Sequence, residues 1–228
     1  MSFLDILLHT PIFQGVSKIN LTTSIEKYHI EFVKFRAGEK IIEKGESLTH
    51  IKFLISGKVL NITPNKPMNL QIKEVFSAPN VIAGNYMFGL ETNSIFEVIA
   101  QTEVGIMQIV KEDFLDLLRK DSIFMINYLN YISSRSQSYF NTVLSLSTGA
   151  LKERFAMWVL LLTQKKAEEI VLVVKLSEVA KLMGDTSDNL QEVLLELKQN
   201  RFISFTESEI KVLNRHALAD LVHDDDLA

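Results

Sequence analysis

A group of polar side chains in the last third of the chain has the chemistry needed to hydrogen-bond DNA bases. Asn and Gln can pair with adenine edges, and Asp can accept a hydrogen bond from the cytosine amino group. The candidate base-reading residues lie within six positions of one another: Thr186, Ser187, Asp188, Asn189 and Gln191. Lys175 and Lys181 precede them and are candidates for phosphate contacts. These residues are therefore candidates for contacts with both the bases and the backbone of DNA.

The stretch that must position these residues is Leu176–Lys198, which reads as two short amphipathic helices. Its apolar residues recur at spacings of three and four, so each helix has one apolar stripe. Gly184 falls where the first helix must end, and Thr186 can cap the second. A helix, a glycine-containing turn and a second helix are typical of the helix-turn-helix motif. Any packed pair of antiparallel helices shares this pattern. The rest of the chain must therefore show whether this pair is a DNA-binding helix-turn-helix.

The bulk composition is that of an ordinary globular protein. The chain has 228 residues, of which 47% are hydrophobic and 23% charged, which suits one large or two small domains. It contains no cysteine, which excludes disulfides and Cys-ligated iron–sulfur clusters. The longest apolar run, Phe155–Leu162, is far shorter than the roughly 20 residues of a membrane-spanning helix. We therefore expect a cytoplasmic protein without a membrane partner.

The first half of the chain has the pattern of a β-protein. Between residues 31 and 110, short strand candidates alternate with glycine-bearing turns, which indicates a sandwich, barrel or jelly roll. The expected strands are 32–35, 40–43, 51–56, 59–63, 70–76 and 97–110. A short helix is expected at 111–120.

A long helix is expected from residue 122 to about 147, and its apolar residues follow a heptad pattern. The residues of this seam are Met125, Leu129, Ile132, Ser136, Tyr139, Val143 and Leu146. One interpretation is a helix that packs on its own domain. We favour a dimer interface, because the helix is long and joins two halves of different composition.

The residues after this helix predict a winged helix. The expected elements are a helix at 150–163, a buried strand at 170–174, the helix pair, a two-stranded ribbon at 202–213 and a last helix capped by Asn214. The predicted domains are a sensor at 1–121, a dimerisation helix at 122–147 and a winged helix-turn-helix at 148–228. The fold class is α+β, with an N-terminal jelly-roll-like β-roll.

The whole pattern resembles the CRP/FNR family of bacterial regulators, over about residues 5–222. The resemblance rests on F-R-A-G-E-K-I-I-E-K-G-E at Phe35–Glu46, F-L-I-S-G-K-V at Phe53–Val59 and E-V-A-K-L-M-G at Glu178–Gly184. It implies a cyclic-nucleotide-binding-like β-roll, a long dimer helix and a winged helix-turn-helix that binds DNA.

The ligand segment departs from the cyclic AMP binders of this family. The resemblance implies a ribose-binding Glu and a phosphate-binding Arg, but Val81–Ala100 contains no Arg or Lys, and Ser94–Ile95 stands where Arg-Ser is expected. A buried phosphodiester without a cation is unfavourable by several kcal/mol, so we predict that cyclic nucleotides do not bind. A different small-molecule effector could use this segment, or its own side chains fill it. The candidate pocket residues are Gly84, Asn85, Tyr86, Phe88, Ser94, Phe96 and Tyr139.

No cofactor is expected. Haem is a remaining candidate in this family, and His9, His29 and His50 in the sensor half could supply an axial ligand, although isolated histidines usually have other roles. No catalytic motif occurs, so an enzyme is not expected.

The DNA surface also departs from the family pattern. The resemblance places Ser187, Asp188 and Glu192 where the cyclic AMP regulator has its base-reading Arg, Glu and Arg. Residues 149–228 hold ten Lys and Arg against fourteen Asp and Glu. Because phosphate neutralisation supplies most non-specific affinity, we expect weak DNA binding unless Lys152, Arg154 and their basic neighbours gather on one face.

These observations predict a homodimeric CRP/FNR-type transcription regulator. Its partners would be double-stranded DNA with a pseudo-palindromic operator, an unidentified small-molecule effector and, as a further candidate, RNA polymerase. The alternative is a family member with a degenerate DNA surface that acts through protein–protein contacts.

Overall fold

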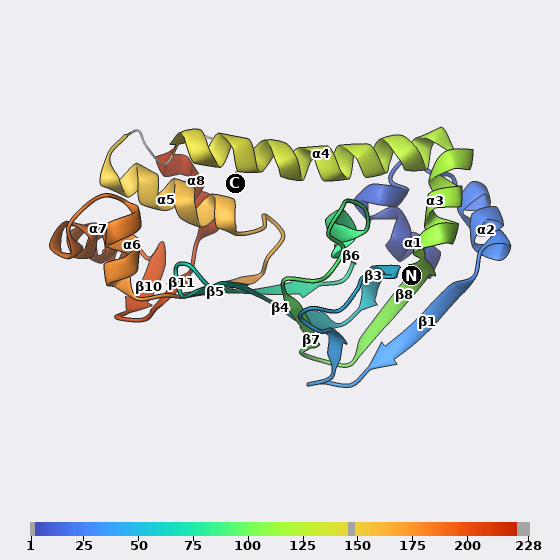
Figure 1. Cartoon of the computed structure of the whole chain (residues 1–228), viewed down its shortest axis with the longest axis horizontal. Coiled ribbons are helices and arrows are strands. Elements are labelled where there is room, and N and C mark those ends of the chain that lie inside the picture. The colour runs from blue at the N-terminus through green and yellow to red at the C-terminus, as the bar shows by residue number, and fades with distance from the viewer. Residues whose placement is uncertain (1–2, 146–148, 223–228) are drawn as a thin grey trace. The chain divides into compact units, whose positions relative to one another are not determined.

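The computed structural model describes residues 3–145 and 149–222 (Figure 1). The chain divides into two compact units. Unit 1 contains residues 1–60 and 77–136, and unit 2 contains residues 61–76 and those from 137 onward. The domain limits of 1–121, 122–147 and 148–228 stay a prediction.

Unit 1 is a β-roll flanked by helices (Figure 1). Its helices are α1 (Phe3–Leu8), η1 (Pro11–Phe13), α2 (Lys18–Lys27), η2 (Gly84–Tyr86), α3 (Lys111–Lys120) and the first part of α4 (Ser122–Ser145). Its strands are β1 (Ile30–Phe35), β2 (Lys40–Ile42), β3 (His50–Ser56), β6 (Asn80–Ile82), β7 (Glu97–Ala100), β8 (Val104–Val110) and the start of β4 (Lys58–Asn65).

The strands of unit 1 pair antiparallel. One sheet has the order β1-β8-β3-β6, and β2 pairs with β7. Phe13 fills the core, where its ring lies 4.9 Å from that of Phe53 and 5.5 Å from that of Phe124 at the start of α4. The expected single strand at 97–110 is wrong, because it is divided into β7 and β8. Sequence reasoning also missed β6, which has only three residues.

Unit 2 is a winged helix (Figure 1). Its elements are β5 (Leu70–Ser77), α5 (Leu151–Leu162), β9 (Glu169–Val173), α6 (Leu176–Leu182), α7 (Ser187–Gln199), β10 (Ile203–Thr206), β11 (Glu209–Val212) and α8 (Arg215–Leu221). Leu190, Leu194 and Leu197 of α7 are buried in one core with Phe155 and Trp158 of α5.

The sheet of unit 2 contains a strand that sequence reasoning assigned to the sensor. Strand β5 pairs antiparallel with β9, from Gln71 opposite Val173 to Val75 opposite Glu169. Leu70 and Ile72 are buried in the core of unit 2. This pairing was not expected, because strand partners about 100 residues apart leave no periodic signal in the sequence.

One carboxylate of β5 is buried in unit 2. Glu74 is 3% exposed, and its Oε1 accepts a hydrogen bond from the backbone N–H of Gln164 at 2.6 Å, just beyond the end of α5. Burial lowers the pKa of the Arg215 guanidinium, and the negative charge of Glu74 opposes that shift. Arg215 also donates to the carbonyl oxygens of Leu160 (2.8 Å) and Thr163 (3.2 Å). Glu74 therefore provides the acceptor for a partly buried backbone N–H just after α5.

The expected fold class is confirmed: an N-terminal β-roll, a long helix and a C-terminal winged helix-turn-helix. Helix α4 is described to Ser145, so its expected end near 147 lies outside the described residues. Among the described residues no helix is long and apolar enough to cross a membrane.

Candidate nucleic-acid interface and sensor segment

The turn between α6 and α7 is built as the sequence predicts. Gly184 has a φ of +64°, a left-handed conformation that glycine adopts without strain. The backbone N–H of Asp185 then returns to the carbonyl oxygen of Ala180 at 3.0 Å. Thr186 caps α7, since its Oγ1 accepts from the backbone N–H of Asn189 at 3.2 Å.

The first turns of α7 present polar residues to solvent. Ser187, Asp188, Asn189 and Gln191 are all exposed, while the apolar stripe of the helix faces the core. The structure therefore brings the predicted base-reading residues onto one exposed helix end. Their contact with DNA stays a prediction.

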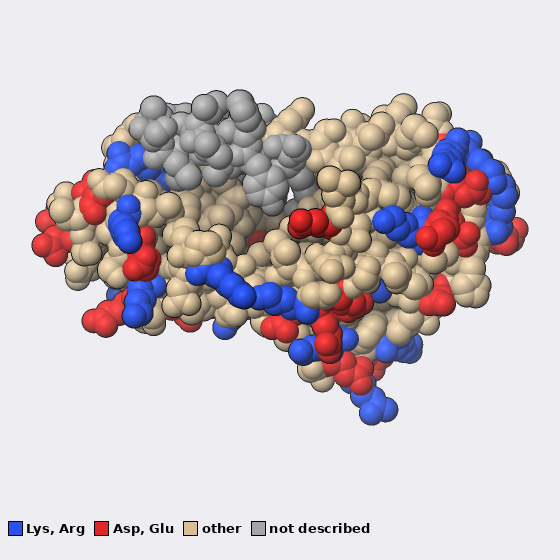
Figure 2. Space-filling model, viewed as in Figure 1, with Lys and Arg blue, Asp and Glu red and all other residues tan. Residues whose placement is uncertain are grey.

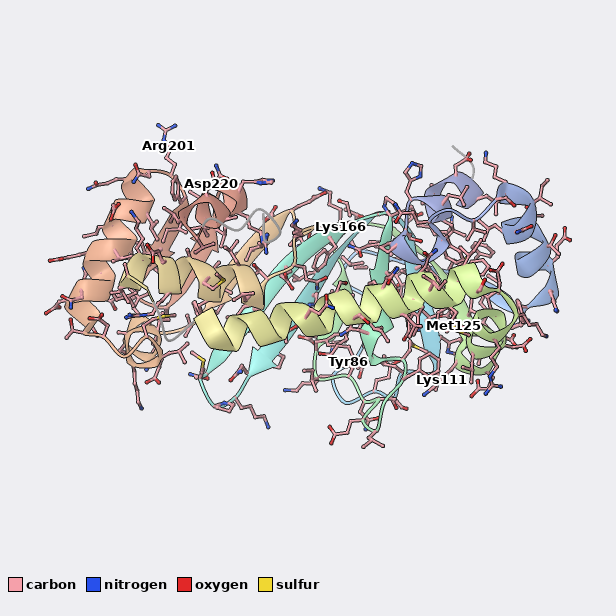
Figure 3. All side chains as sticks on the ribbon, turned by 90° about the horizontal axis from the view of Figure 1, so that it is seen from above. Tyr86, Lys111, Met125, Lys166, Arg201 and Asp220 are labelled. Atoms are coloured by element: carbon pink, nitrogen blue, oxygen red, sulfur yellow. The ribbon has the colours of Figure 1, made fainter. Side chains whose placement is uncertain are left out.

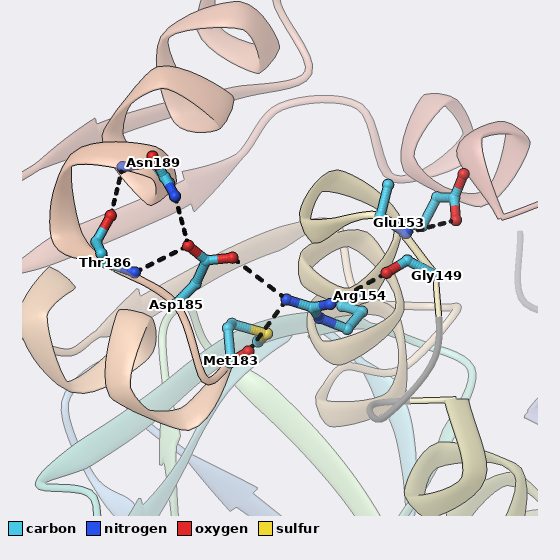
Figure 4. Close-up of polar contacts among 8 residues, drawn as sticks. Gly149, Glu153, Arg154, Met183, Asp185, Thr186 and Asn189 are labelled. Atoms are coloured by element: carbon cyan, nitrogen blue, oxygen red, sulfur yellow. Dashed lines mark hydrogen bonds and ion pairs between the residues drawn. The ribbon is translucent and has the colours of Figure 1, made fainter.

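A network of charged and polar groups connects this turn to Arg154 of α5 (Figure 4). The Nδ2 of Asn189 donates to Oδ1 of Asp185 at 2.7 Å, and the backbone N–H of Thr186 donates to the same oxygen at 2.9 Å. The other oxygen of Asp185 lies 3.5 Å from Nη2 of Arg154 in α5. Hydrogen bonds from Asn189 and from the Thr186 backbone, together with the charge of Arg154, hold the pKa of the Asp185 carboxyl below its ordinary value.

Sequence reasoning missed Asp185 and offered Arg154 only as a surface cation. The structure places Arg154 inside, with a side chain 19% exposed, so it is not free to contact phosphate. Its Nη1 donates to the carbonyl oxygen of Gly149 at 3.0 Å and its Nη2 to that of Met183 at 3.1 Å. The sequence offered one signal for this role. Asp185 directly follows the turn glycine Gly184, where its carboxylate can accept hydrogen bonds from residues at the start of α7.

The other basic side chains do not form a continuous area on the face seen in Figure 2, where described Lys and Arg alternate with Asp and Glu around α6 and α7. Lys175, just before α6, and Lys181 within it are exposed, as phosphate contacts require. Lys152 forms a salt bridge with Glu196, with 2.7 Å between Nζ and Oε1. Arg201, which has a φ of +61°, lies beyond the end of α7 and points away from the unit (Figure 3).

In unit 1, the predicted ligand segment at 81–100, called the sensor segment below, is covered at Gly84 by two aromatic side chains of α4. The hydroxyl of Tyr128 donates to the carbonyl oxygen of Gly84 at 2.9 Å. Burial, and then the neighbouring Tyr131, raise the pKa of Tyr128, which keeps that hydroxyl protonated. A Cβ on Gly84 would lie 2.7 Å from Cγ1 of Val81 and 3.0 Å from Cε1 of Tyr131. A larger residue at position 84 would therefore require the side chains of Val81 and Tyr131 to shift.

Most of the remaining candidate ligand residues contact other side chains or backbone of unit 1. The rings of Tyr86 and Phe96 lie 5.1 Å apart, and Phe88 contacts the ring of Tyr128 edge-on at 5.8 Å. Ser94 is buried, and its hydroxyl donates to the carbonyl oxygen of Phe96 at 2.6 Å. Asn85 is half-buried. The side chain of Tyr139, the seventh candidate, lies outside the described residues.

These contacts favour the interpretation that the protein's own side chains occupy the predicted ligand pocket. A hollow of about 230 Å³ lies elsewhere in unit 1 and is lined by residues of α2, α3 and their flanks. The lining residues are Asn20, Thr23, Lys27, Tyr28, Leu117, Lys120 and Asp121. Sequence reasoning missed Tyr128 and Tyr131, although Phe124, Tyr128 and Tyr131 form an aromatic stripe at helical spacing beside the heptad seam.

The predicted dimer seam begins on an exposed face of α4. Met125 is 38% exposed and Leu129 is 49% exposed, and Ile126 beside them is 55% exposed. Ile132 is half-buried. The side chains of Ser136, Tyr139 and Val143 are not described, and Leu146 lies outside the described residues. An exposed row of large apolar residues is consistent with a partner surface.

The three histidines of the sensor half make local contacts. His9 Nδ1 lies 2.7 Å from the carbonyl oxygen of Asp5, His50 Nδ1 lies 2.8 Å from Oγ1 of Thr49, and His29 lies 3.5 Å from Glu31. Within the described part of the chain, no group of three His, Cys, Asp or Glu residues is placed to hold a metal ion.

Comparison with known proteins identifies a domain family in the first half of the chain. Residues 32–121 match the family model of the cyclic nucleotide-binding domain. No curated protein matches the chain. Solved structures that align with it include the catabolite activator protein of Thermus thermophilus, at 17% identity over 96% of this chain and 100% of that chain, with a TM-score of 0.49. Another is DNR of Pseudomonas aeruginosa, at 19% identity over 95% and 96%, with a TM-score of 0.46.

A transcriptional regulator of Thermotoga maritima also aligns, at 22% identity over 57% of this chain and 98% of that chain, with a TM-score of 0.49. The family model confirms the predicted cyclic-nucleotide-binding-like sensor over residues 32–121. The match covers most of the β-roll and α3.

Proposed function

We propose that this protein is a homodimeric, DNA-binding transcription regulator of the CRP/FNR type. The observation that carries the proposal is the exposed, N-capped start of α7, which presents Ser187, Asp188, Asn189 and Gln191 in a winged helix. The residues at the N-terminal end of a recognition helix are those that reach base edges in the major groove. A dimer formed through α4 would read two half-sites about one helical turn apart.

The effector of this regulator is not cyclic AMP. Residues 81–100 contain no Lys or Arg to neutralise a cyclic phosphate. Gly84 is closed by Tyr128 and Tyr131, and the hydroxyl of Ser94 is bonded to its own loop. A regulator of this kind would respond to a different small molecule, or to none.

The test is a selection of bound sequences from random double-stranded DNA at low salt. We expect a pseudo-palindromic motif, because a two-fold dimer reads two equivalent half-sites. The variant Asn189→Ala should lose preference at one position of each half-site by about fivefold or more, since a good base contact contributes about 1–3 kcal/mol of discrimination. Absence of any motif at low salt would contradict the proposal.

A second function is favoured by the charge of the same surface. Asp188 and Glu192 are exposed on α7, and Glu207 and Glu209 lie at the turn between β10 and β11. Because like charges repel the DNA backbone, these residues support a family member that acts through protein–protein contacts. The selection distinguishes the two functions, since a protein-binding module would enrich no DNA motif.

A further inference from the structure

The side chain of Asn189 is held in one orientation by its neighbours. Its Nδ2 lies 2.7 Å from Oδ1 of Asp185, while its backbone N–H is bonded to Oγ1 of Thr186 at 3.2 Å. The residue is nevertheless exposed at the start of α7. One part of the amide is therefore fixed inside the turn while another faces outward.

The chemistry of the two groups fixes which part faces outward. An ionised carboxylate can only accept hydrogen bonds, so the nitrogen of the Asn189 amide must face Asp185. The amide is planar, so its oxygen then lies on the side away from Asp185, as Figure 4 shows. Asn189 therefore offers an acceptor to an approaching partner, together with the second N–H of its amide.

Arg154 fixes Asp185 in turn. The guanidinium lies 3.5 Å from the second oxygen of Asp185 and is itself bonded to the carbonyl oxygens of Gly149 and Met183. Both side chains are less than a quarter exposed, at 19% for Arg154 and 23% for Asp185. Arg154 therefore connects the start of α5, the end of α6 and the first turn of α7. A rigid support of this kind is what a base-reading side chain needs to select one orientation.

We infer that Arg154 and Asp185 are positioning residues that orient Asn189 to read a base with an exocyclic amino group in the major groove, adenine or cytosine. This inference rests on the proposed function. Adenine N6 and cytosine N4 donate hydrogen bonds, whereas guanine and thymine present only acceptors at the corresponding positions. The neighbouring Asp188 is exposed and, when ionised, offers only acceptors. The start of α7 thus favours donor-bearing base edges.

The test compares the motifs selected by the full-length protein and by Asp185→Asn. The position that loses its preference in Asn189→Ala identifies the base read by Asn189. In the unsubstituted protein we expect adenine or cytosine there, preferred about tenfold, and the same loss when that base is replaced by an analogue that lacks the amino group. Asn at 185 can donate as well as accept, so Asp185→Asn frees the Asn189 amide to turn. The preference at that position should then fall below about threefold.

The matched control is Asp220→Asn, which removes the same charge from an exposed position of α8 (Figure 3). It should leave the motif unchanged, because loss of a negative charge alone raises affinity for all sequences together. Melting curves of both variants establish that they are folded.

A second measurement needs no DNA. The side-chain NH₂ resonances of Asn189, assigned with Asn189→Ala, should be protected from solvent exchange relative to those of the exposed Gln191. Asp185→Asn or Arg154→Lys should remove that protection.

The outcomes separate the inference from the function on which it rests. A motif with guanine or thymine at the Asn189 position, or an Asp185→Asn variant with unchanged preference, overturns the inference alone. No motif for the unsubstituted protein overturns the proposed function, and unprotected Asn189 NH₂ resonances overturn the orientation itself.

Discussion

Aromatic rings close the sensor segment of unit 1, whereas charged and amide groups hold the helix-turn-helix of unit 2. In unit 1, Tyr86 packs on Phe96, and Tyr128 and Tyr131 close over Gly84. In unit 2, the carboxylate of Asp185 accepts a hydrogen bond from the amide of Asn189 and forms an ion pair with the guanidinium of Arg154. Each region lies where the resemblance expects ligand or DNA chemistry, yet each is organised by a different kind of interaction.

The difference determines what each region can tolerate. A close-packed group of rings is sensitive to added volume, because protein interiors have few voids larger than a water molecule. A polar network is sensitive to loss of charge or of a hydrogen-bonding atom, because the partner left behind is unsatisfied. Substitutions that change only volume or only charge therefore separate the two regions.

The largest effect is expected in unit 2, from Glu74→Ala. It should lower the free energy of unfolding by about 3 kcal/mol, because it leaves the N–H of Gln164 without its acceptor and removes the negative charge that offsets the burial of the Arg215 guanidinium. The fluorescence of Trp158, the single Trp of the chain and a member of the same core, reports this unfolding in urea. Glu74→Gln retains an acceptor for the N–H of Gln164 and should lower the free energy of unfolding by less. Equal losses in the two variants would show that the charge alone matters.

A smaller effect is expected in unit 1, from Gly84→Ala. The added methyl group would collide with Val81 and Tyr131 and should destabilise the segment by about 1–3 kcal/mol. Amide hydrogen exchange in β6 and η2 measures this local loss. Val81→Ala removes the methyl groups that the new side chain would meet. Gly84→Ala should therefore destabilise the Val81→Ala variant less than it destabilises the unsubstituted protein. If Gly84→Ala changes no exchange rate, the segment is not closed by packing.

The smallest effect is expected from the pH dependence of the turn. The folded-state pKa of Asp185 lies below its ordinary value, so this carboxylate stabilises the folded state above the ordinary pKa of an aspartate. That stabilisation should be lost as the pH falls below about 4. The difference in stability between the unsubstituted protein and Asp185→Asn should therefore shrink from pH 7 to pH 3 in urea unfolding. A difference independent of pH would contradict the network, and Asp220→Asn controls for the loss of one surface charge.

Much of the fold could be predicted because local signals set it. Thr186 and Asn214 were predicted to cap helices, and both side chains accept the expected backbone N–H, that of Asn189 at 3.2 Å and that of Ala217 at 3.0 Å. Caps depend on residues three positions apart, which a sequence displays directly. The division of 97–110 into two strands was missed, although the three polar residues at 101–103 that separate them are a local signal.

The candidate sites were predicted less completely. The sequence identified the exposed residues of α7, since their type and helical spacing are local properties. It did not identify Arg154 as an internal support, because its partners Gly149, Met183 and Asp185 come from separate elements. It also left open whether the sensor segment is empty or filled.

The sequence by itself determined the order of elements, the absence of any cation in Val81–Ala100 and the polar character of the start of α7. Each of these is a property of residue type and spacing. Only the tertiary structure decided that β5 pairs with β9, that Tyr128 and Tyr131 close over Gly84, and that Arg154 is used inside the protein. The physical reason is that these features depend on side chains and strands far apart in the chain, whose meeting is set by packing rather than by local pattern.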